Sequence, residues 1–292
     1  MSFAGTHTAL VTPFRDGAFD LEAFRKLIED QIAGGVEGIV PVGTTGESPT
    51  LTHEEHTEVI RAAVEIAKGR CKVIAGTGSN ATTEAIALTV EAEKLGADAA
   101  LLVAPYYNKP SQEGLYRHFR AIAEAVKIPI ILYSIPGRCG VEIGVETTAR
   151  LAKDCPNIVA IKEAGGTVER VSALKQAVPA SFEILSGDDS LTLPFMVAGA
   201  VGVISVASNL LPKEVSDFVR AWLKGDVKAA QAAHVHYYKL FKDLFIEPNP
   251  APIKLALALK GGMSPEVRLP LCEMTNESVS KLTGTLRGLG LA

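Results

Sequence analysis

The sequence predicts a closed (β/α)8 barrel followed by a C-terminal helical segment, and three observations support this prediction. Eight short apolar runs rich in β-branched residues recur along the first three quarters of the chain. Segments with helical periodicity separate these runs, and continuously apolar strands between helices are typical of parallel strands buried on both faces. Eight such units in about 225 residues fit a barrel of this type, which typically takes about 250 residues.

The expected strands and helices follow one another regularly. Apolar residues spaced three and four apart predict helices around residues 24–32, 59–66 and 119–126. Thr52 and Glu55 have the spacing of a capping box, Ser111 precedes a helical run, and glycines at 34–35, 69 and 96 stand where helices should end. The eight predicted strands are TALVT (8–12), GIVPV (38–42), KVIAG (72–76), AALLVA (99–104), IPIILY (128–133), IVAIK (158–162), FEILS (182–186) and GVISV (202–206).

The strand signals end after residue 224. Helical patterns cover 226–246, 251–260 and 275–290, with prolines between them. We therefore predict two domains, a barrel at 1–224 and a helical domain at 225–292. An open doubly wound sheet is the alternative architecture, but the segment TPFRDGAFD after the first strand lacks the glycine-rich fingerprint of such sheets.

The composition argues against a nucleic-acid-binding, membrane or secreted protein. The 292 residues are 47% hydrophobic and carry a net charge of −4, with no basic run that would indicate nucleic acid or an anionic membrane as a partner. The four cysteines are scattered without a CxxC pair, which favours a reducing compartment. The N-terminus has no signal-peptide pattern, and the apolar runs are too short to span a bilayer. These features predict a cytoplasmic protein.

The residues that follow the strands predict the site, because active sites of (β/α)8 barrels lie at the C-terminal ends of the strands. They comprise hydroxyls, glycines, one strand-end lysine (Lys162) and one nearby arginine (Arg138), without a histidine. The segments are GTTGES (43–48), GTGSN (76–80), PYYN (105–108), YSIPGR (133–138), KE (162–163) and SGDD (186–189).

This set of residues favours Schiff-base chemistry. A lysine amine at the mouth of an apolar barrel loses hydration, which lowers its pKa and frees it to attack a carbonyl. Tyr133 and Thr44 can relay protons, and the Thr44-Thr45 amides and hydroxyls can bind a keto-acid carboxylate. No metal or other cofactor is required. A solvated lysine whose stem lies along apolar surface is the alternative for Lys162, but the joint placement of these residues on one rim favours a catalytic site.

The motifs resemble the dihydrodipicolinate synthase group, within the pyruvate-dependent class I aldolase superfamily that includes N-acetylneuraminate lyase. The likeness runs from ALVTPF (9–14) to the C-terminal helices and depends on six pieces in order, VGTTGES, VIAGTGSN, APYYNKP, YSIPGR, IVAIKEA and SGDD. It implies a barrel enzyme that condenses pyruvate with L-aspartate 4-semialdehyde, the first committed step towards diaminopimelate and lysine. It also implies a homotetramer built as a dimer of dimers.

The resemblance implies roles for the residues that match the family's motifs. Lys162 would form the Schiff base with pyruvate, and Tyr133 would move protons at that carbon. Thr44 and Tyr107 would complete a hydroxyl relay to solvent, with Tyr107 reaching into the site of the neighbouring subunit. Thr45 would hold the pyruvate carboxylate.

Further positions concern the second substrate and the pocket wall. The resemblance implies that Arg138 binds the carboxylate of L-aspartate 4-semialdehyde, and that Gly187 and Ile204 line the pocket. The chain departs from the family's pattern next to Arg138, because Ser134 stands where Asn is common and Cys139 where Thr is common. Both departures bear on the choice of acceptor.

A regulatory site is also implied. In the family, inhibitory lysine binds at a dimer interface, and L-lysine is therefore an expected inhibitor here. Two of the residues concerned are histidines with a metal-like spacing, but they do not form an HExxH motif and no third ligand is evident. The matching positions are Ser48, His53, His56, Asn80, Glu84 and Tyr106.

Other functions stay open at this point. Another Schiff-base pyruvate aldolase or dehydratase, acting on a sugar acid as N-acetylneuraminate lyase does, would use the same lysine. A barrel that binds a keto acid without catalysis is a second alternative. A metal-dependent class II aldolase is disfavoured by the lack of rim histidines. Arg138 favours the synthase, because a basic residue suits a small acidic aldehyde better than a neutral sugar.

Overall fold

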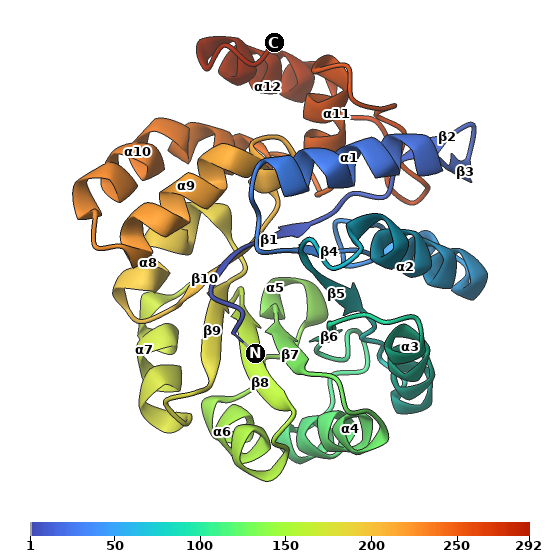
Figure 1. Cartoon of the computed structure of the whole chain (residues 1–292), viewed down its shortest axis with the longest axis vertical. Coiled ribbons are helices and arrows are strands. Elements are labelled where there is room, and N and C mark those ends of the chain that lie inside the picture. The colour runs from blue at the N-terminus through green and yellow to red at the C-terminus, as the bar shows by residue number, and fades with distance from the viewer. Residues whose placement is uncertain (1) are drawn as a thin grey trace.

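The computed structural model describes residues 2–292 and contains a closed barrel of eight parallel strands (Figure 1). Each strand pairs with two neighbours in the order β1-β10-β9-β8-β7-β6-β5-β4. The strands are β1 (Gly5–Ala9), β4 (Gly38–Val40), β5 (Lys72–Gly76), β6 (Ala99–Val103), β7 (Ile130–Ser134), β8 (Ile158–Glu163), β9 (Glu183–Ser186) and β10 (Gly202–Ser205). The prediction of a (β/α)8 barrel is confirmed, and the open-sheet alternative is wrong.

The first strand is the one whose predicted position is wrong. It covers Gly5–Ala9 rather than 8–12, because its polar side chains find buried hydrogen-bond partners. Thr8 is buried and its hydroxyl donates to Gln31 Oε1 at 2.7 Å. The His7 ring is buried as well, 2.8 Å from the Phe3 carbonyl oxygen. A strand of this kind carries no continuous apolar signal.

The helices surround the barrel (Figure 1). The capping box at Thr52 and Glu55 and the cap at Ser111 are both confirmed. The barrel helices are α1 (Leu21–Ala33), α2 (His53–Ala67), α3 (Thr82–Lys94), α4 (Gln112–Ala125), α6 (Val145–Asp154), α7 (Val168–Ala177), α8 (Thr192–Val197) and α9 (Pro212–Leu223). Short additions are the hairpin β2 (Phe14–Arg15) and β3 (Ala18–Phe19), the one-turn helix α5 (Pro136–Cys139), and the 3-10 turns η1 (Ser48–Thr50), η2 (Asp189–Leu191) and η3 (Ala207–Asn209).

Two hydrophobic clusters hold these layers together. The larger lies between the strands and the helices, and the smaller fills the barrel interior. The interior cluster includes Val40, Ile74, Ile131, Tyr133 and Ile204, all buried. An apolar interior of this kind has a low effective dielectric constant, so any ionisable group at its mouth is strongly affected by desolvation.

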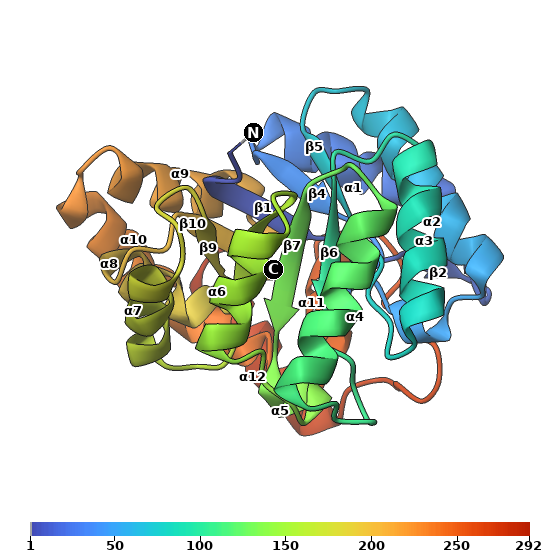
Figure 2. The ribbon, with the colours of Figure 1, turned by 90° about the horizontal axis from the view of Figure 1, so that it is seen from below.

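Three helices follow the barrel, as the sequence predicts. They are α10 (Val227–Asp243), α11 (Ala251–Leu259) and α12 (Asn276–Gly288). Figure 2 shows α5, α11 and α12 at the end of the barrel towards which β7 points, the end where the predicted site residues lie. The division of the chain into domains at 1–224 and 225–292 stays a prediction. Within residues 2–292, none of the helices has the length and apolarity needed to cross a membrane.

Candidate active site

Lys162 lies near the C-terminal end of β8 and its side chain is buried in the barrel mouth. The residue is 5% exposed, and its Nζ lies 4.3 Å from the centre of the Tyr133 ring. Burial lowers the pKa of the amine from 10.5 to about 8; the Asp189 carboxylate opposes this shift and Arg138 adds to it. The alternative of a solvated lysine is therefore wrong. The arrangement supplies a substantial neutral, nucleophilic fraction near neutral pH.

The lowered pKa of Lys162 predicts the pH dependence of imine formation. Below pH 8 the amine is mostly protonated, so the rate of reductive trapping by pyruvate and cyanoborohydride should rise about tenfold from pH 6 to pH 7 and level off above pH 8 to 9. A rate that keeps rising to pH 10 would indicate an amine with an ordinary pKa. A trapping rate that does not change with pH would show that attack by the Lys162 amine does not limit imine formation.

Tyr133 faces Lys162 from the adjacent strand. The two residues are register partners between β7 and β8. Burial raises the pKa of the Tyr133 hydroxyl; the charge of Arg138 and a hydrogen bond with the Thr44 side chain oppose this. The phenol therefore stays protonated at neutral pH and lies between Lys162 and the Thr44 side chain.

Thr44 and Thr45 lie in the loop between β4 and η1. Thr44 lines the cavity, whereas Thr45 is buried beside it and accepts a hydrogen bond from Asn249 Nδ2 at 2.9 Å. The Thr12 hydroxyl donates to the Gly46 carbonyl oxygen at 2.7 Å. Hydrogen bonds from two distant parts of the chain therefore hold this loop against the barrel.

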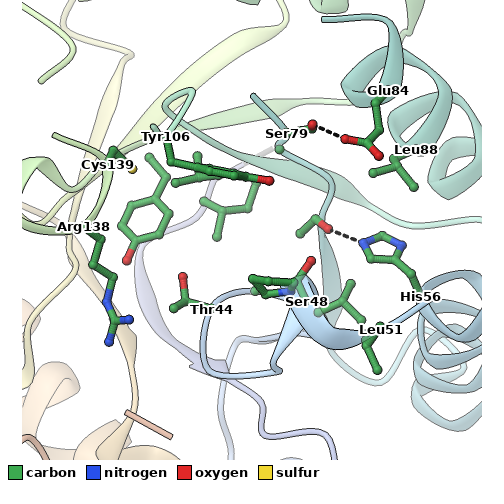
Figure 3. Close-up of a pocket in the computed structure, with 18 of the residues that line it drawn as sticks. Thr44, Ser48, Leu51, His56, Ser79, Glu84, Leu88, Tyr106, Arg138 and Cys139 are labelled. Atoms are coloured by element: carbon green, nitrogen blue, oxygen red, sulfur yellow. Dashed lines mark hydrogen bonds between the residues drawn. The ribbon is translucent and has the colours of Figure 1, made fainter. Parts of the chain in front are cut away.

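A single cavity of about 390 Å³ joins Thr44, Tyr133 and Arg138 to most of the predicted lysine-binding residues, whereas Lys162 and Thr45 are not part of its lining (Figure 3). Figure 3 shows Arg138 and Thr44 on one side and Glu84 and His56 on the other, with Tyr106 lying between. Cys139, beside Arg138, also lines the cavity, and burial raises the pKa of its thiol to about 11. The predicted residues that line the cavity are Thr44, Tyr133, Arg138, Ser48, His53, His56, Glu84 and Tyr106.

The far end of the cavity is polar. Glu84 Oε1 lies 2.8 Å from the His53 Nε2, and Glu84 Oε2 accepts from the Ser79 hydroxyl. The His56 ring contacts the Gly76 carbonyl oxygen at 2.9 Å, and burial lowers the pKa of this ring. Asn80 does not line the cavity, and its side-chain amide donates to the Tyr106 carbonyl oxygen at 3.2 Å. Ser79, which sequence reasoning did not single out, lies beside it within the same GTGSN segment.

Asp189 is a second residue to which the sequence alone assigned no role. It follows β9, is 2% exposed, and accepts hydrogen bonds from the backbone N–H groups of Val206 and Ala207 at 3.0 and 2.9 Å. Burial raises the pKa of its carboxyl to about 6. Its negative charge is the one that favours the protonated form of Lys162. Its position in the SGDD segment, directly after a predicted strand, indicates that it could belong to the site, but the segment alone does not distinguish Asp189 from Asp188.

The remaining predicted residues occupy different surroundings. A Cβ added at Gly187 would lie 3.1 Å from Lys162 Cε, so only glycine leaves this approach open. Ile204 packs with Tyr133 in the barrel interior. Ser134 is buried, and its hydroxyl accepts from the Ile143 N–H at 3.3 Å. Tyr107 is 89% exposed with a φ of 72°, so the single chain does not bring it to the cavity.

Proteins of known function resemble this chain along nearly its whole length. The model of the dihydrodipicolinate synthetase family matches residues 2–288. The 4-hydroxy-tetrahydrodipicolinate synthase of Aquifex aeolicus is 53% identical over 289 residues, 99% of this chain and 98% of the relative. The solved structure of the chloride-inhibited dihydrodipicolinate synthase of Acinetobacter baumannii, complexed with pyruvate, is 45% identical, covers 100% of both chains and has a TM-score of 0.97. That of the Cyanidioschyzon merolae protein with lysine bound is 42% identical, covers 99% of both chains and has a TM-score of 0.96.

Proposed function

Because this chain belongs to the dihydrodipicolinate synthetase family, we propose that Lys162 is the residue that binds pyruvate covalently in the family's reaction. The reaction is that of a lyase, the condensation of pyruvate with L-aspartate 4-semialdehyde to 4-hydroxy-tetrahydrodipicolinate in lysine biosynthesis. The observation that carries the assignment is the buried Lys162 amine, with a pKa of about 8, beside the Tyr133 ring. The comparisons support this activity rather than a sugar-acid aldolase or a non-catalytic barrel.

The proposed steps follow from the positions of these groups. The neutral Lys162 amine attacks the keto carbon of pyruvate and water leaves, which gives a protonated imine. The imine withdraws electrons, so a methyl proton is lost and an enamine forms. The enamine carbon bonds to the aldehyde carbon of the second substrate, whose amino group then attacks the imine carbon, closes the ring and releases Lys162. Tyr133, in contact with Thr44, is placed to transfer the protons of these steps.

The two substrates carry carboxylates, and two parts of the site are proposed to bind them. Thr45, with Thr44, would hold the pyruvate carboxylate, and Gly187 and Ile204 would shape the wall beside it. Arg138, at the cavity wall, would bind the carboxylate of L-aspartate 4-semialdehyde. An arginine is suited to this role because its guanidinium offers a fork of N–H donors to a carboxylate.

Replacement of Arg138 by alanine tests the second substrate. We expect Arg138→Ala to lower kcat/KM for L-aspartate 4-semialdehyde about 10- to 100-fold, the usual effect of losing hydrogen bonds to a charged group, while pyruvate is still trapped on Lys162. N-acetylmannosamine, the acceptor for a sialic acid lyase, should give no turnover with the parent protein. Turnover with the sugar, or an Arg138→Ala variant with unchanged kcat/KM, would contradict the assignment.

Feedback inhibition by L-lysine is also proposed. The polar end of the cavity offers a carboxylate (Glu84) and further polar groups (Ser48, His53 and His56), with Asn80 and Tyr106 beside them, which suits a zwitterion with an ammonium side chain. Inhibition by millimolar L-lysine should weaken in Glu84→Gln, because the amide lacks the negative charge that attracts the ammonium group. Full activity of the parent protein in millimolar L-lysine would refute this proposal.

The role proposed for Tyr107 depends on the assembly of several chains. The exposed position of this tyrosine supports the proposal that it enters the site of a neighbouring subunit in a homotetramer and extends the Thr44 relay. A molar mass of one chain in sedimentation equilibrium at assay concentration would contradict it.

A further inference from the structure

A fully buried ion pair joins the C-terminal helical segment to the active-site loop. Lys254, on α11, pairs with Glu47, which ends the loop that carries Thr44 and Thr45, and neither side chain has exposed surface. The Lys254 Nζ also donates to the Glu266 carbonyl oxygen at 2.7 Å. The second carboxylate oxygen of Glu47 accepts from the Arg268 backbone N–H at 2.9 Å. Both carboxylate oxygens of Glu47 therefore accept hydrogen bonds from the C-terminal helical segment.

The loop that Glu47 ends has an unfavourable backbone conformation. Val42 and Glu47, on either side of the segment 43–46, have φ angles of 50° and 55°. This region is costly for a side chain with a Cβ, most of all for a β-branched one such as Val42. Such conformations persist where the surrounding structure holds them, and they gather at functional sites. The loop therefore needs contacts from outside itself.

The C-terminal segment supplies such contacts at two points. Besides the Lys254–Glu47 pair, Asn249, two residues before α11, donates from Nδ2 to Thr45 Oγ1 at 2.9 Å. Asn249 is 5% exposed. One short stretch, 249–254, thus contacts the residue proposed to hold pyruvate and the residue two positions beyond it.

General stability does not account for this ion pair. Removing two charges from water costs about as much as their attraction returns, and apolar residues of the same volume often stabilise a protein equally well. Unlike apolar residues, an ion pair fixes the orientation of its groups, because its hydrogen bonds hold the carboxylate in one position. The place held here is the end of the pyruvate-binding loop.

We propose that Glu47 and Lys254 form a positioning pair that sets Thr44 and Thr45 for pyruvate, so that the C-terminal helical segment takes part in substrate binding. The proposal rests on the roles proposed above for Thr44, Thr45 and Lys162. Neither Glu47 nor Lys254 touches pyruvate. By positioning Thr45, they lower the pyruvate concentration needed to occupy the site. By positioning Thr44, they increase the rates of the proton-transfer steps.

The test measures reductive trapping of pyruvate on Lys162 as a function of pyruvate concentration. In Lys254→Met, which keeps the side-chain length, the half-saturating pyruvate concentration should rise about tenfold or more. Saturating pyruvate should still label Lys162. Glu47→Gln keeps an oxygen that accepts from Lys254 and should shift the concentration less. Asp243→Asn is the control, since it removes a buried charge of the same segment, bonded to Lys239 and Thr285, away from the loop.

Each outcome decides one proposal. If Lys254→Met and Glu47→Gln melt cooperatively and half-saturate within twofold of the parent protein, the positioning role is overturned while the Schiff base stands. If the parent protein is not labelled on Lys162, the proposed function itself fails. Should Lys254→Met not fold, Glu47→Gln/Lys254→Met, which buries no unpaired charge, takes its place with the same two criteria. A control that shifts as far as Lys254→Met would reduce the pair to a structural role.

Discussion

Replacement of Lys162 by arginine should lower turnover at least about 10³-fold, because the guanidinium stays protonated at every working pH and cannot attack a carbonyl. The parent amine is buried beside Tyr133 and has a pKa of about 8, whereas arginine would place a permanent charge in the same position. The measurement is kcat with saturating pyruvate and L-aspartate 4-semialdehyde, with circular dichroism as the test of folding. We expect the arginine variant to keep its fold.

Lys162→Met is the matched variant for this experiment. It has nearly the volume of lysine without its charge, so it removes the nucleophile and leaves no buried cation. Both variants should retain the far-ultraviolet spectrum of the parent protein and fail to form an adduct with pyruvate. Residual activity above about 1% in a folded Lys162→Met protein would show that another group carries the reaction.

Replacement of Tyr133 by phenylalanine should lower both imine formation and condensation about 10²- to 10⁴-fold, the usual contribution of a positioned proton-transfer group. The raised pKa of the buried hydroxyl keeps its proton available at neutral pH, and phenylalanine keeps the ring against Lys162 but loses that proton. Stopped-flow measurement of imine formation and steady-state turnover follow the two steps separately.

Tyr116→Phe is the control for Tyr133→Phe. Tyr116 is also buried and its hydroxyl donates to Asp154 at 2.8 Å, but it lies on α4, outside the cavity lining. Loss of this hydroxyl should change melting temperature more than rate. Equal losses of rate in the two variants would indicate that Tyr133 acts through packing rather than proton transfer.

Much of the barrel could be predicted from the sequence because its signals are local. Seven of the eight strands lie within two residues of the apolar runs that predicted them, since each run is continuous and bounded by turn residues. The exception, β1, contains Thr6, His7 and Thr8, whose burial depends on partners elsewhere in the chain. The apolar run that extends up to Lys162 left a solvated side chain as an alternative, and the joint placement of the strand-end residues is what favoured a catalytic lysine.

The supports of the site could not be predicted in this way. Glu47 and Lys254 are 207 positions apart, and no local pattern indicates that a glutamate in a turn will meet a lysine in a later helix. Asn249 likewise lies within a proline-rich connection rather than at the end of a strand, so the rule that barrel sites lie at strand ends does not predict it. Asp189 follows a strand, so that rule includes it. Its effect on the pKa of Lys162 depends on its burial, which only the folded chain shows.

The most direct measurement of the central claim is peptide mapping by mass spectrometry after reduction of the protein with borohydride in the presence of pyruvate. The account predicts one added reduced pyruvate per chain, located on the peptide that contains Lys162, and none without pyruvate or in Lys162→Met. An adduct on a different residue, or no adduct in a protein that turns over pyruvate, would contradict it.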